Sequence, residues 1–227
     1  MTPKDFQRVL WINLPRRTDR HKAFLERLDA VADWPFRTPE CVDGLEMEPP
    51  PFWRSQPNAY GILRAHLAIY HTCLCLGVKR ALILEDDCVF CPDFSQKVTD
   101  WLAKVPDDWD MVYLGGNHCQ LPWRVDDNVL QGTGINAAHA YGITSLGMMK
   151  LFRALQVFPK LLKDSNCHID TLCVTLQDLG KIRAYSPLHW FAGQAAGNSD
   201  RVSYQWDTDQ YFDLPDEVLN NLEPVPC

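Results

Sequence analysis

The sequence predicts an α/β fold built on a mainly parallel sheet that is flanked by helices. Short apolar runs of strand type alternate along the chain with segments whose apolar residues recur every three or four positions, the spacing of an amphipathic helix. This alternation is typical of α/β proteins. The chain has 227 residues, of which 46% are hydrophobic and 22% charged, and this is the length and balance of one globular domain.

Five short apolar runs are the expected strands, and Gly115-Gly116 is expected to end the third of them. These runs contain residues 8–14, 81–84, 110–114, 138–143 and 182–185. Five amphipathic segments are the expected helices, and Gly77 and Gly180 follow the second and the last of them as stop signals. These segments contain residues 20–31, 63–76, 93–105, 146–155 and 170–179.

Two regions lack this pattern. Residues 49–57 are rich in proline, and we expect an irregular excursion there. The last segment, residues 192–227, is interrupted by glycine and proline and is expected to wrap around the sheet. Because no linker separates a second domain, we expect one domain over residues 1–227, with a core of about residues 8–200 and a tail from 201.

Charge and hydropathy exclude some classes of partner. The chain has 22 basic and 29 acidic residues and a net charge of −7, so it has no basic surplus with which to bind a nucleic-acid backbone. No apolar stretch approaches the roughly 18 residues of a transmembrane helix, and the amino-terminal apolar run is too short for a signal peptide. We therefore expect a soluble cytoplasmic protein, either free or peripheral at the inner face of a membrane.

The nine cysteines do not predict a disulfide framework, because their number is odd and the domain is large. Cys88 and Cys91 form a C-x-x-C motif near Cys73 and Cys75, so a four-thiolate zinc site is one alternative. Residues two positions apart do not share a helix face, which argues against joint ligation by Cys73 and Cys75. We expect free thiols, structural or incidental.

Three consecutive carboxylates, Glu85, Asp86 and Asp87, directly follow the expected strand 81–84. Open α/β sheets bind ligands at the carboxyl ends of their strands, so these side chains are placed where a ligand is expected. Like charges this close resist joint ionisation unless a cation neutralises them. Carboxylate oxygens suit Mg²⁺ or Mn²⁺, and the alternative is a solvated acidic turn.

Polar and basic residues also follow the first expected strand. Asn13 ends that strand, and Arg16, Arg17 and Arg20 lie in the turn into the next helix. Basic side chains and free N–H groups at such a turn suit an anion. The alternative is a set of solvated arginines with Asp19 as a helix cap. The usual nucleotide-binding glycine motifs and the serine-hydrolase motif G-x-S-x-G are absent.

Together these residues resemble glycosyltransferase family 25, which includes lipopolysaccharide glycosyltransferases and collagen galactosyltransferases. The opening VLWINLPRRTDRHKAFLERL and the strand with its acidic turn, ALILEDD, carry the resemblance most specifically. Weaker similarities are the blocks YGILRAHLAIYHTCL, DMVYLGG and HAYGITSLGMMKLF and the segment 194–200, so that the resemblance spans roughly residues 8–200. Departures are the shortened proline-rich region and the tail after residue 200.

The resemblance implies a GT-A fold, in which a Rossmann-like sheet binds a UDP-sugar together with Mn²⁺ or Mg²⁺. It implies that Asp87 binds the metal ion and that Glu85 or Asp86 faces the ribose or the ion. The nucleotide would be approached by the side chains of Asn13, Arg16, Arg17 and His66.

A late histidine often completes the metal shell in such enzymes, and His189 and His168 are the two candidates here. His118 could line the cleft, whereas His139 begins a strand and is expected to be a satisfied edge residue. A carboxylate at the start of a late helix can act as general base, which favours Asp170. The alternative is that Asp170 only caps its helix, and the fallback bases are Asp164 and Asp200.

The function predicted from the sequence is inverting transfer of galactose or glucose from a UDP-sugar to a hydroxyl of a glycan or protein acceptor, assisted by a metal ion. Lipopolysaccharide biosynthesis is one setting for such an enzyme. The alternatives are a metal-dependent nucleotidyltransferase or phosphohydrolase and an inactive nucleotide-sugar-binding module of the same fold.

Overall fold

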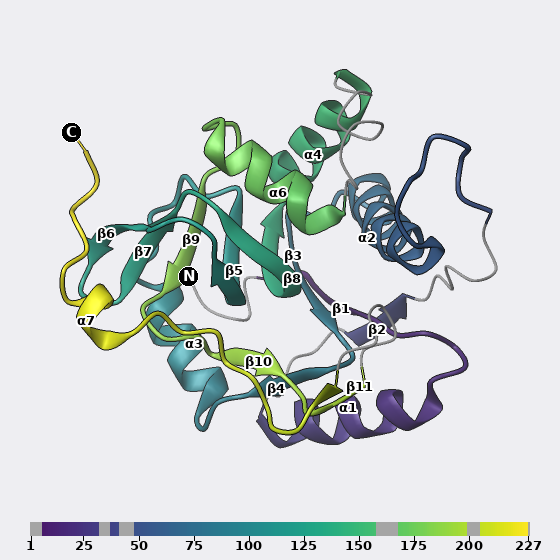
Figure 1. The fold of residues 1–227 in the computed structure, drawn as a ribbon, viewed down its shortest axis with the longest axis horizontal. Coiled ribbons are helices and arrows are strands. Elements are labelled where there is room, and N and C mark those ends of the chain that lie inside the picture. Colours follow the sequence, from purple (N-terminus) through teal and green to yellow (C-terminus); the bar gives the residue numbers. More distant parts are fainter. Residues whose placement is uncertain (1–5, 32–36, 41–47, 158–167, 199–204, 227) are drawn as a thin grey trace.

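The structure is a computed structural model that describes residues 6–31, 37–40, 48–157, 168–198 and 205–226 (Figure 1). The strands are β1 (Arg8–Ile12), β2 (Arg37–Glu40), β3 (Arg80–Glu85), β4 (Cys88–Phe90), β5 (Met111–His118), β6 (Trp123–Asp126), β7 (Val129–Gly132), β8 (Ile135–Thr144), β9 (Ala184–Pro187), β10 (Ala192–Gln194), β11 (Gly197–Asn198) and β12 (Gln205–Trp206). The helices are α1 (Thr18–Val31), α2 (Pro57–Cys75), α3 (Phe94–Leu102), α4 (Ser145–Val157), α6 (Ile169–Asp178) and α7 (Asp216–Leu219).

The main sheet has eight strands in the order β2-β1-β3-β8-β5-β9-β7-β6. The α/β class is confirmed, but the expectation of a mainly parallel sheet is wrong. The pairs β1–β2, β1–β3 and β5–β9 are parallel, whereas β3–β8, β5–β8, β7–β9 and β6–β7 are antiparallel. A parallel return requires a long crossover, usually a helix. Between β5 and β8 the chain forms the β6–β7 hairpin instead, so β8 returns antiparallel to β5.

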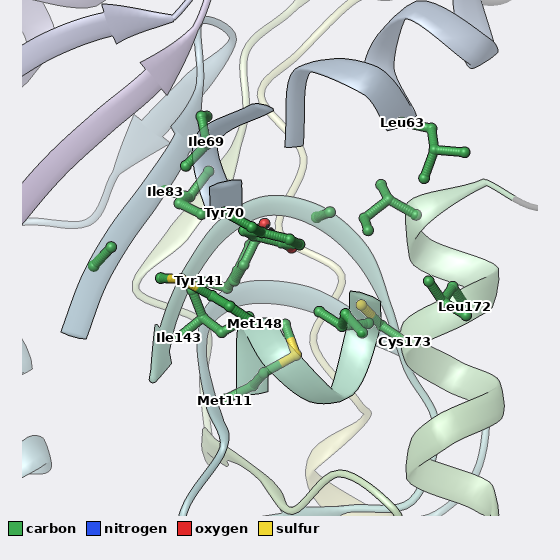
Figure 2. Close-up of a cluster of buried hydrophobic side chains, with 14 of the residues drawn as sticks. Leu63, Ile69, Tyr70, Ile83, Met111, Tyr141, Ile143, Met148, Leu172 and Cys173 are labelled. Atoms are coloured by element: carbon green, nitrogen blue, oxygen red, sulfur yellow. Dashed lines mark hydrogen bonds between the residues drawn. The ribbon is translucent and has the colours of Figure 1, made fainter. Parts of the chain in front are cut away.

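Helices cover both faces of the sheet, α2, α4 and α6 on one side and α1 and α3 on the other (Figure 1). Strand residues alternate between these two cores, as the two-residue period of a strand requires. On β3, Ala81 and Ile83 pack toward α2, while Leu82 and Leu84 pack toward α1 and α3. Figure 2 shows the first core, in which Tyr70 of α2 meets Tyr141 of β8.

Element boundaries differ from the expected ones at two places that matter for the site. Helix α2 begins at Pro57, because proline at the first helical position gives up an N–H that would have no partner there. Strand β5 does not end at Gly115 but continues to His118 with register shifts. A Cβ at Gly115 would collide with the ring of His139 and the carbonyl of Ala192, so a glycine allows this close packing.

The carboxyl-terminal segment runs along the α1 and α3 side of the molecule (Figure 1). Strand β10 pairs antiparallel with β4, and Gln194 forms a bridge with Gln210. The indole nitrogen of Trp190 donates a hydrogen bond to the carbonyl of Phe212 at 3.0 Å. A bridge between Arg124 and Pro224 then connects the segment to β6. None of the helices in the described segments is long and apolar enough to cross a membrane.

Six cysteines lie in the described segments, and all six are free thiols. They are Cys73, Cys75, Cys88, Cys91, Cys119 and Cys173. The remaining three, Cys41, Cys167 and Cys227, lie outside the described residues.

Candidate active site

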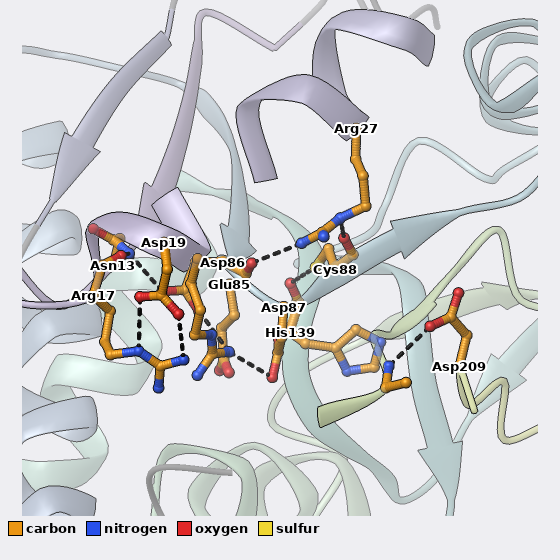
Figure 3. Close-up of polar contacts among 12 residues, drawn as sticks. Asn13, Arg17, Asp19, Arg27, Glu85, Asp86, Asp87, Cys88, His139 and Asp209 are labelled. Carbon is orange, nitrogen blue, oxygen red and sulfur yellow. Dashed lines mark hydrogen bonds and ion pairs between the residues drawn. The ribbon is translucent and has the colours of Figure 1, made fainter. Parts of the chain in front are cut away.

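The three consecutive carboxylates lie where β3 ends and turns into β4. Glu85 is the last residue of β3, and Asp86 and Asp87 form the turn. Strand β1 pairs parallel with β3, and Ile12 is in register with Glu85. Because carboxyl ends of parallel strands share one edge of the sheet, Asn13 is brought beside the acidic turn, as Figure 3 shows.

Asp86 is buried, and both of its carboxylate oxygens have partners within the protein. Asn13 Nδ2 donates to Asp86 Oδ2 at 2.6 Å, and Arg20 Nη2 lies 2.6 Å from Asp86 Oδ1. Burial, together with the nearby charges of Asp87 and Glu85, raises the pKa of Asp86 to about 6 against the opposing effects of Arg20 and Asn13. Asp86 therefore anchors the turn to β1 and α1.

Asp87 is only partly compensated. Its Oδ2 lies 3.1 Å from the same nitrogen of Arg20, while its Oδ1 is shielded from solvent and has no hydrogen-bond partner among the described residues. Burial and the charge of Glu85 raise the pKa of Asp87. A buried carboxylate oxygen without a donor is costly, so this atom is suited to a cation.

Glu85 faces α2 at the same edge. Its Oε1 lies 3.7 Å from Nε2 of the fully buried His66, and His66 Nδ1 bonds the hydroxyl of Tyr141 at 2.7 Å. Tyr141 in turn shares a hydrogen bond with Tyr70. Burial by itself raises the pKa of Glu85, but the contact with His66 and the charges of His66, His139 and Arg20 outweigh it and lower that pKa.

Two residues that were not expected in the site lie at the acidic turn. Arg27 of α1 donates to the carbonyls of Cys88 and Asp86 at 2.8 and 3.0 Å and so holds the backbone of the turn. His139 of β8 is buried and close enough to Glu85 and Asp87 for its charge to act on both (Figure 3). The spacing of Arg27 seven residues after Arg20, on one helix face, is a signal that could have found it.

His139 was missed because the sheet was taken to be mainly parallel. In a parallel sheet the first residues of a strand lie at the edge opposite the carboxyl ends. Strand β8 is antiparallel to β3, with Leu84 in register with Ala140, so the preceding His139 lies at the carboxyl end of β3. The expectation of a satisfied edge residue is wrong for its Nδ1, which is buried and has no hydrogen-bond partner in the described part of the chain.

The arginines expected to approach an anion lie in the turn before α1. Arg16 is exposed, and Arg17 is half-buried and binds Asp19 through two contacts of 3.0 Å. The hydrogen bond from Arg17 lowers the pKa of Asp19 to about 2. The carbonyl of Arg17 also accepts a hydrogen bond from Asn13 at 3.2 Å, which connects this turn to the acidic turn.

The two late histidines are not brought to Asp87. The side chain of His189 is 58% exposed, and its Nδ1 lies 4.0 Å from Asp213 Oδ1. At one end of the β10–β4 pair, the carbonyl of Asp87 accepts a hydrogen bond from the N–H of Ala195. His189 lies beyond the other end of this pair, three residues before Ala192. This separation contradicts joint metal binding by Asp87 and His189, because both ligands of one ion must lie within a few ångströms of each other. His168 instead bonds the hydroxyl of Ser55 at 3.2 Å.

Asp170 lies in the first turn of α6, but it is not the helix cap, which is His168. The alternative that Asp170 caps its helix is therefore wrong. Its charge acts on the buried hydroxyls of Tyr70 and Tyr113, so it lies near the tyrosine cluster behind His66. The fallback bases Asp164 and Asp200 lie outside the described residues.

A metal ion would find a partial ligand set here. In the described residues no group of three or more His, Cys, Asp or Glu side chains is placed so that it could hold a metal ion. Mg²⁺ and Mn²⁺ sites in phosphate-handling proteins often use only one or two carboxylates and take the other ligands from the phosphates and water. The orphan oxygen of Asp87 fits such a site.

No protein-family model matches the chain. Solved structures similar to it include a glycosyltransferase involved in glycosylation of the major capsid of PBCV-1, with 14% identity, a TM-score of 0.38 and coverage of 66% of each chain. Another is a Drosophila β-1,4-galactosyltransferase 7 mutant in complex with manganese, UDP-Gal and xylobiose, with 10% identity, a TM-score of 0.45 and coverage of 96% of this chain and 75% of that one.

A third is a putative glucose-1-phosphate thymidylyltransferase from Bacillus anthracis in complex with sucrose, with 11% identity and a TM-score of 0.42. It is matched over 82% of this chain and 69% of its own. Glycosyltransferases and a sugar nucleotidyltransferase are thus among the structures that this chain resembles distantly.

Proposed function

We propose that this chain is an inverting glycosyltransferase that moves galactose or glucose from a UDP-sugar to a hydroxyl of a glycan or protein, assisted by Mn²⁺ or Mg²⁺. The observation that carries the proposal is the acidic turn after β3, where Asp87 keeps a buried oxygen without a donor among the described residues. A cation that accompanies a sugar diphosphate would compensate this oxygen. The chemistry that the metal supplies when bound is stabilisation of the charge that develops on the diphosphate leaving group.

The surrounding residues have separate parts in this proposal. Asn13 and Arg20 hold Asp86 and keep the turn in place, while Glu85 and Asp87, each 25% exposed, present oxygens to the ion or the ribose. Arg16 and Arg17, in the turn before α1, would bind the nucleotide together with Asn13. His66 would contribute through Glu85, from which it lies 3.7 Å away.

An inverting transfer also requires a base that takes the proton of the acceptor hydroxyl as the new bond forms. We assign this part to Asp170. Its position in the first turn of α6 fixes its backbone, and its charge reaches the tyrosine cluster that adjoins His66. The acceptor would then lie on the α2 and α6 side of the cluster, with the donor at the acidic turn.

The test is incubation of the purified chain with UDP-galactose or UDP-glucose, Mn²⁺ and a panel of sugar acceptors, with products identified by mass spectrometry and NMR. The proposal predicts release of UDP and a product whose anomeric configuration is inverted, and loss of both with EDTA. Release of pyrophosphate from a nucleoside triphosphate and a sugar phosphate would favour a nucleotidyltransferase instead.

Binding without turnover is the third outcome. A ligand that binds only the folded state stabilises it by about 2.7 kcal/mol at a hundredfold excess over Kd. A Mn²⁺-dependent rise in Tm with UDP-sugars, but no product with any acceptor and no UDP released by hydrolysis, would identify an inactive nucleotide-sugar-binding module.

A further inference from the structure

The ring of His139 is held in one orientation by the strands around it. The side chain is 1% exposed, and its Nε2 lies 3.5 Å from the carbonyl oxygen of Ala192. Gly115 on the neighbouring strand leaves the space that the ring edge occupies, because a Cβ there would collide with Nε2. The imidazole is therefore seated against the backbone of β5 and β10 with Nε2 toward Ala192.

This contact favours one tautomer of neutral His139. A carbonyl oxygen can only accept, so a hydrogen bond to Ala192, whose oxygen is 3.5 Å away, would place the proton on Nε2. Nδ1 then keeps a lone pair, and it is buried without a hydrogen-bond partner among the described residues. Histidines that bind metals have this arrangement, in which the second ring N–H donates to a backbone carbonyl or a carboxylate.

Independent contacts place His139 beside Asp87. The thiol of Cys88, the residue after Asp87, donates to the carbonyl of His139 at 2.8 Å. Ala195, three residues after Ala192, donates its N–H to the carbonyl of Asp87 at 2.7 Å. Figure 3 shows the two side chains next to each other. Asp87 Oδ1 and His139 Nδ1 are thus neighbouring buried acceptors, and each has no donor in the described part of the structure.

We infer that His139 Nδ1 and Asp87 are two protein ligands of one divalent cation. Two acceptors cannot hydrogen-bond each other, whereas a cation bound between them satisfies both. An imidazole nitrogen beside a carboxylate favours a transition-metal ion such as Mn²⁺ over Mg²⁺, which binds through oxygen ligands. The inference deepens the proposed function, on which its choice of metal rests, and replaces His189 as the histidine of the site.

The test measures the metal and not the reaction. Wild-type protein with Mn²⁺ alone, and with Mn²⁺ and UDP, is examined by pulsed electron paramagnetic resonance for coupling of Mn²⁺ to a histidine ¹⁴N nucleus. Coupling is expected in the wild type, lost in His139→Gln and retained in His189→Gln. Calorimetry should show weaker Mn²⁺ binding in His139→Gln. Loss of a residue that only hydrogen-bonds a metal ligand costs ~10-fold to 100-fold in affinity, and loss of a direct ligand should cost at least as much.

Metal-free thermal unfolding of each variant shows whether it is folded. The exposed position of His189 makes its variant a control that leaves the core intact, and the wild-type spectrum tests the inference even if His139→Gln does not fold. Absence of ¹⁴N coupling in the wild type, loss of coupling in His189→Gln, or its persistence in folded His139→Gln would overturn the inference. Mn²⁺-dependent sugar transfer without nitrogen coupling would support the proposed function and overturn His139 as a metal ligand. Nitrogen coupling without sugar transfer would support the metal site and not the proposed function.

Discussion

Buried aspartates lie at two opposite edges of the sheet, and their surroundings differ. Asp110 precedes β5 at the edge where β3 begins, and its Oδ2 contacts Lys150 Nζ at 2.6 Å and the backbone N–H of Arg183 at 2.9 Å. At the edge where β3 ends, Arg20 serves Asp86 and Asp87 together. There Asp87 Oδ1 has no donor among the described residues.

The difference separates a carboxylate whose charge is compensated within the chain from one that is only partly compensated. At the Asp110 edge one carboxylate has one cation and one N–H, so the charge is compensated within the chain. At the acidic turn Asp86 and Asp87 share the charge of Arg20, and burial raises the pKa of both. Stability alone does not favour such an arrangement, and raised carboxylate pKa values of this kind are common at functional sites, which agrees with the proposed function.

The largest expected effect is that of Asp87→Asn, which removes the charge but keeps the shape. If the acidic turn binds the metal, UDP-sugar transfer should fall by ~10³-fold or more, which corresponds to several kcal/mol of lost charge stabilisation. Because the turn carries excess negative charge, the free energy of unfolding without metal should not fall. Steady-state kinetics and urea unfolding check both results, and near-normal turnover would remove Asp87 from the metal site.

A comparable loss of rate is expected for Asp170→Asn, but without loss of donor binding. If Asp170 is the base, kcat should drop by roughly 10² to 10⁴, since the amide cannot accept the proton. The loss of a negative charge in the first turn of α6 should cost only about 0.3 to 1 kcal/mol of stability. UDP affinity by calorimetry should match the wild type, and a wild-type kcat would exclude Asp170 as the base.

A third prediction concerns pH and His118, the last residue of β5, which lies at the edge of the sheet where β3 also ends. Burial lowers its pKa to about 4, so the unfolded chain binds a proton here between about pH 6.5 and pH 4 and the folded chain does not. The contribution of His118 to the free energy of unfolding is therefore greatest above pH 6.5, and it falls by up to about 3 kcal/mol as the pH drops to 4.

Urea unfolding at several pH values checks this sign. His118→Gln should flatten the pH dependence in that window, whereas replacement of the exposed His71 by glutamine should leave it as in the wild type. Equal slopes for wild type and His118→Gln would show that His118 does not stay neutral in the fold.

The smallest effect is expected for a change of Asp110, whose charge is compensated within the chain. Asp110→Asn weakens the bonds to Lys150 and Arg183 and should cost about 2 kcal/mol of stability. The rate of sugar transfer should not change, because this edge is remote from the acidic turn. Asp127→Asn, at an exposed position, is the control for stability. A large loss of turnover in Asp110→Asn would contradict the view that only the acidic turn serves the reaction.

Much of the strand and helix pattern could be read from local sequence. The expected strand 81–84 lies within β3, and the expected helix 146–155 lies within α4. Short strands such as β4 and β10 were missed because three residues carry too little periodicity. Their pairing depends on contact between segments about a hundred residues apart, and no local pattern encodes that contact.

The candidate site divides in the same way. The sequence by itself determined that Asp86 and Asp87 follow a buried strand, because a run of apolar residues must enter the core and the charged residues begin where that run ends. Only the tertiary structure decided which side chains meet them. Strand direction is set by long-range pairing, and the same alternation of residues fits either direction. The antiparallel β8 brings His139 to the acidic turn, and the register of β10 with β4 keeps His189 away from it.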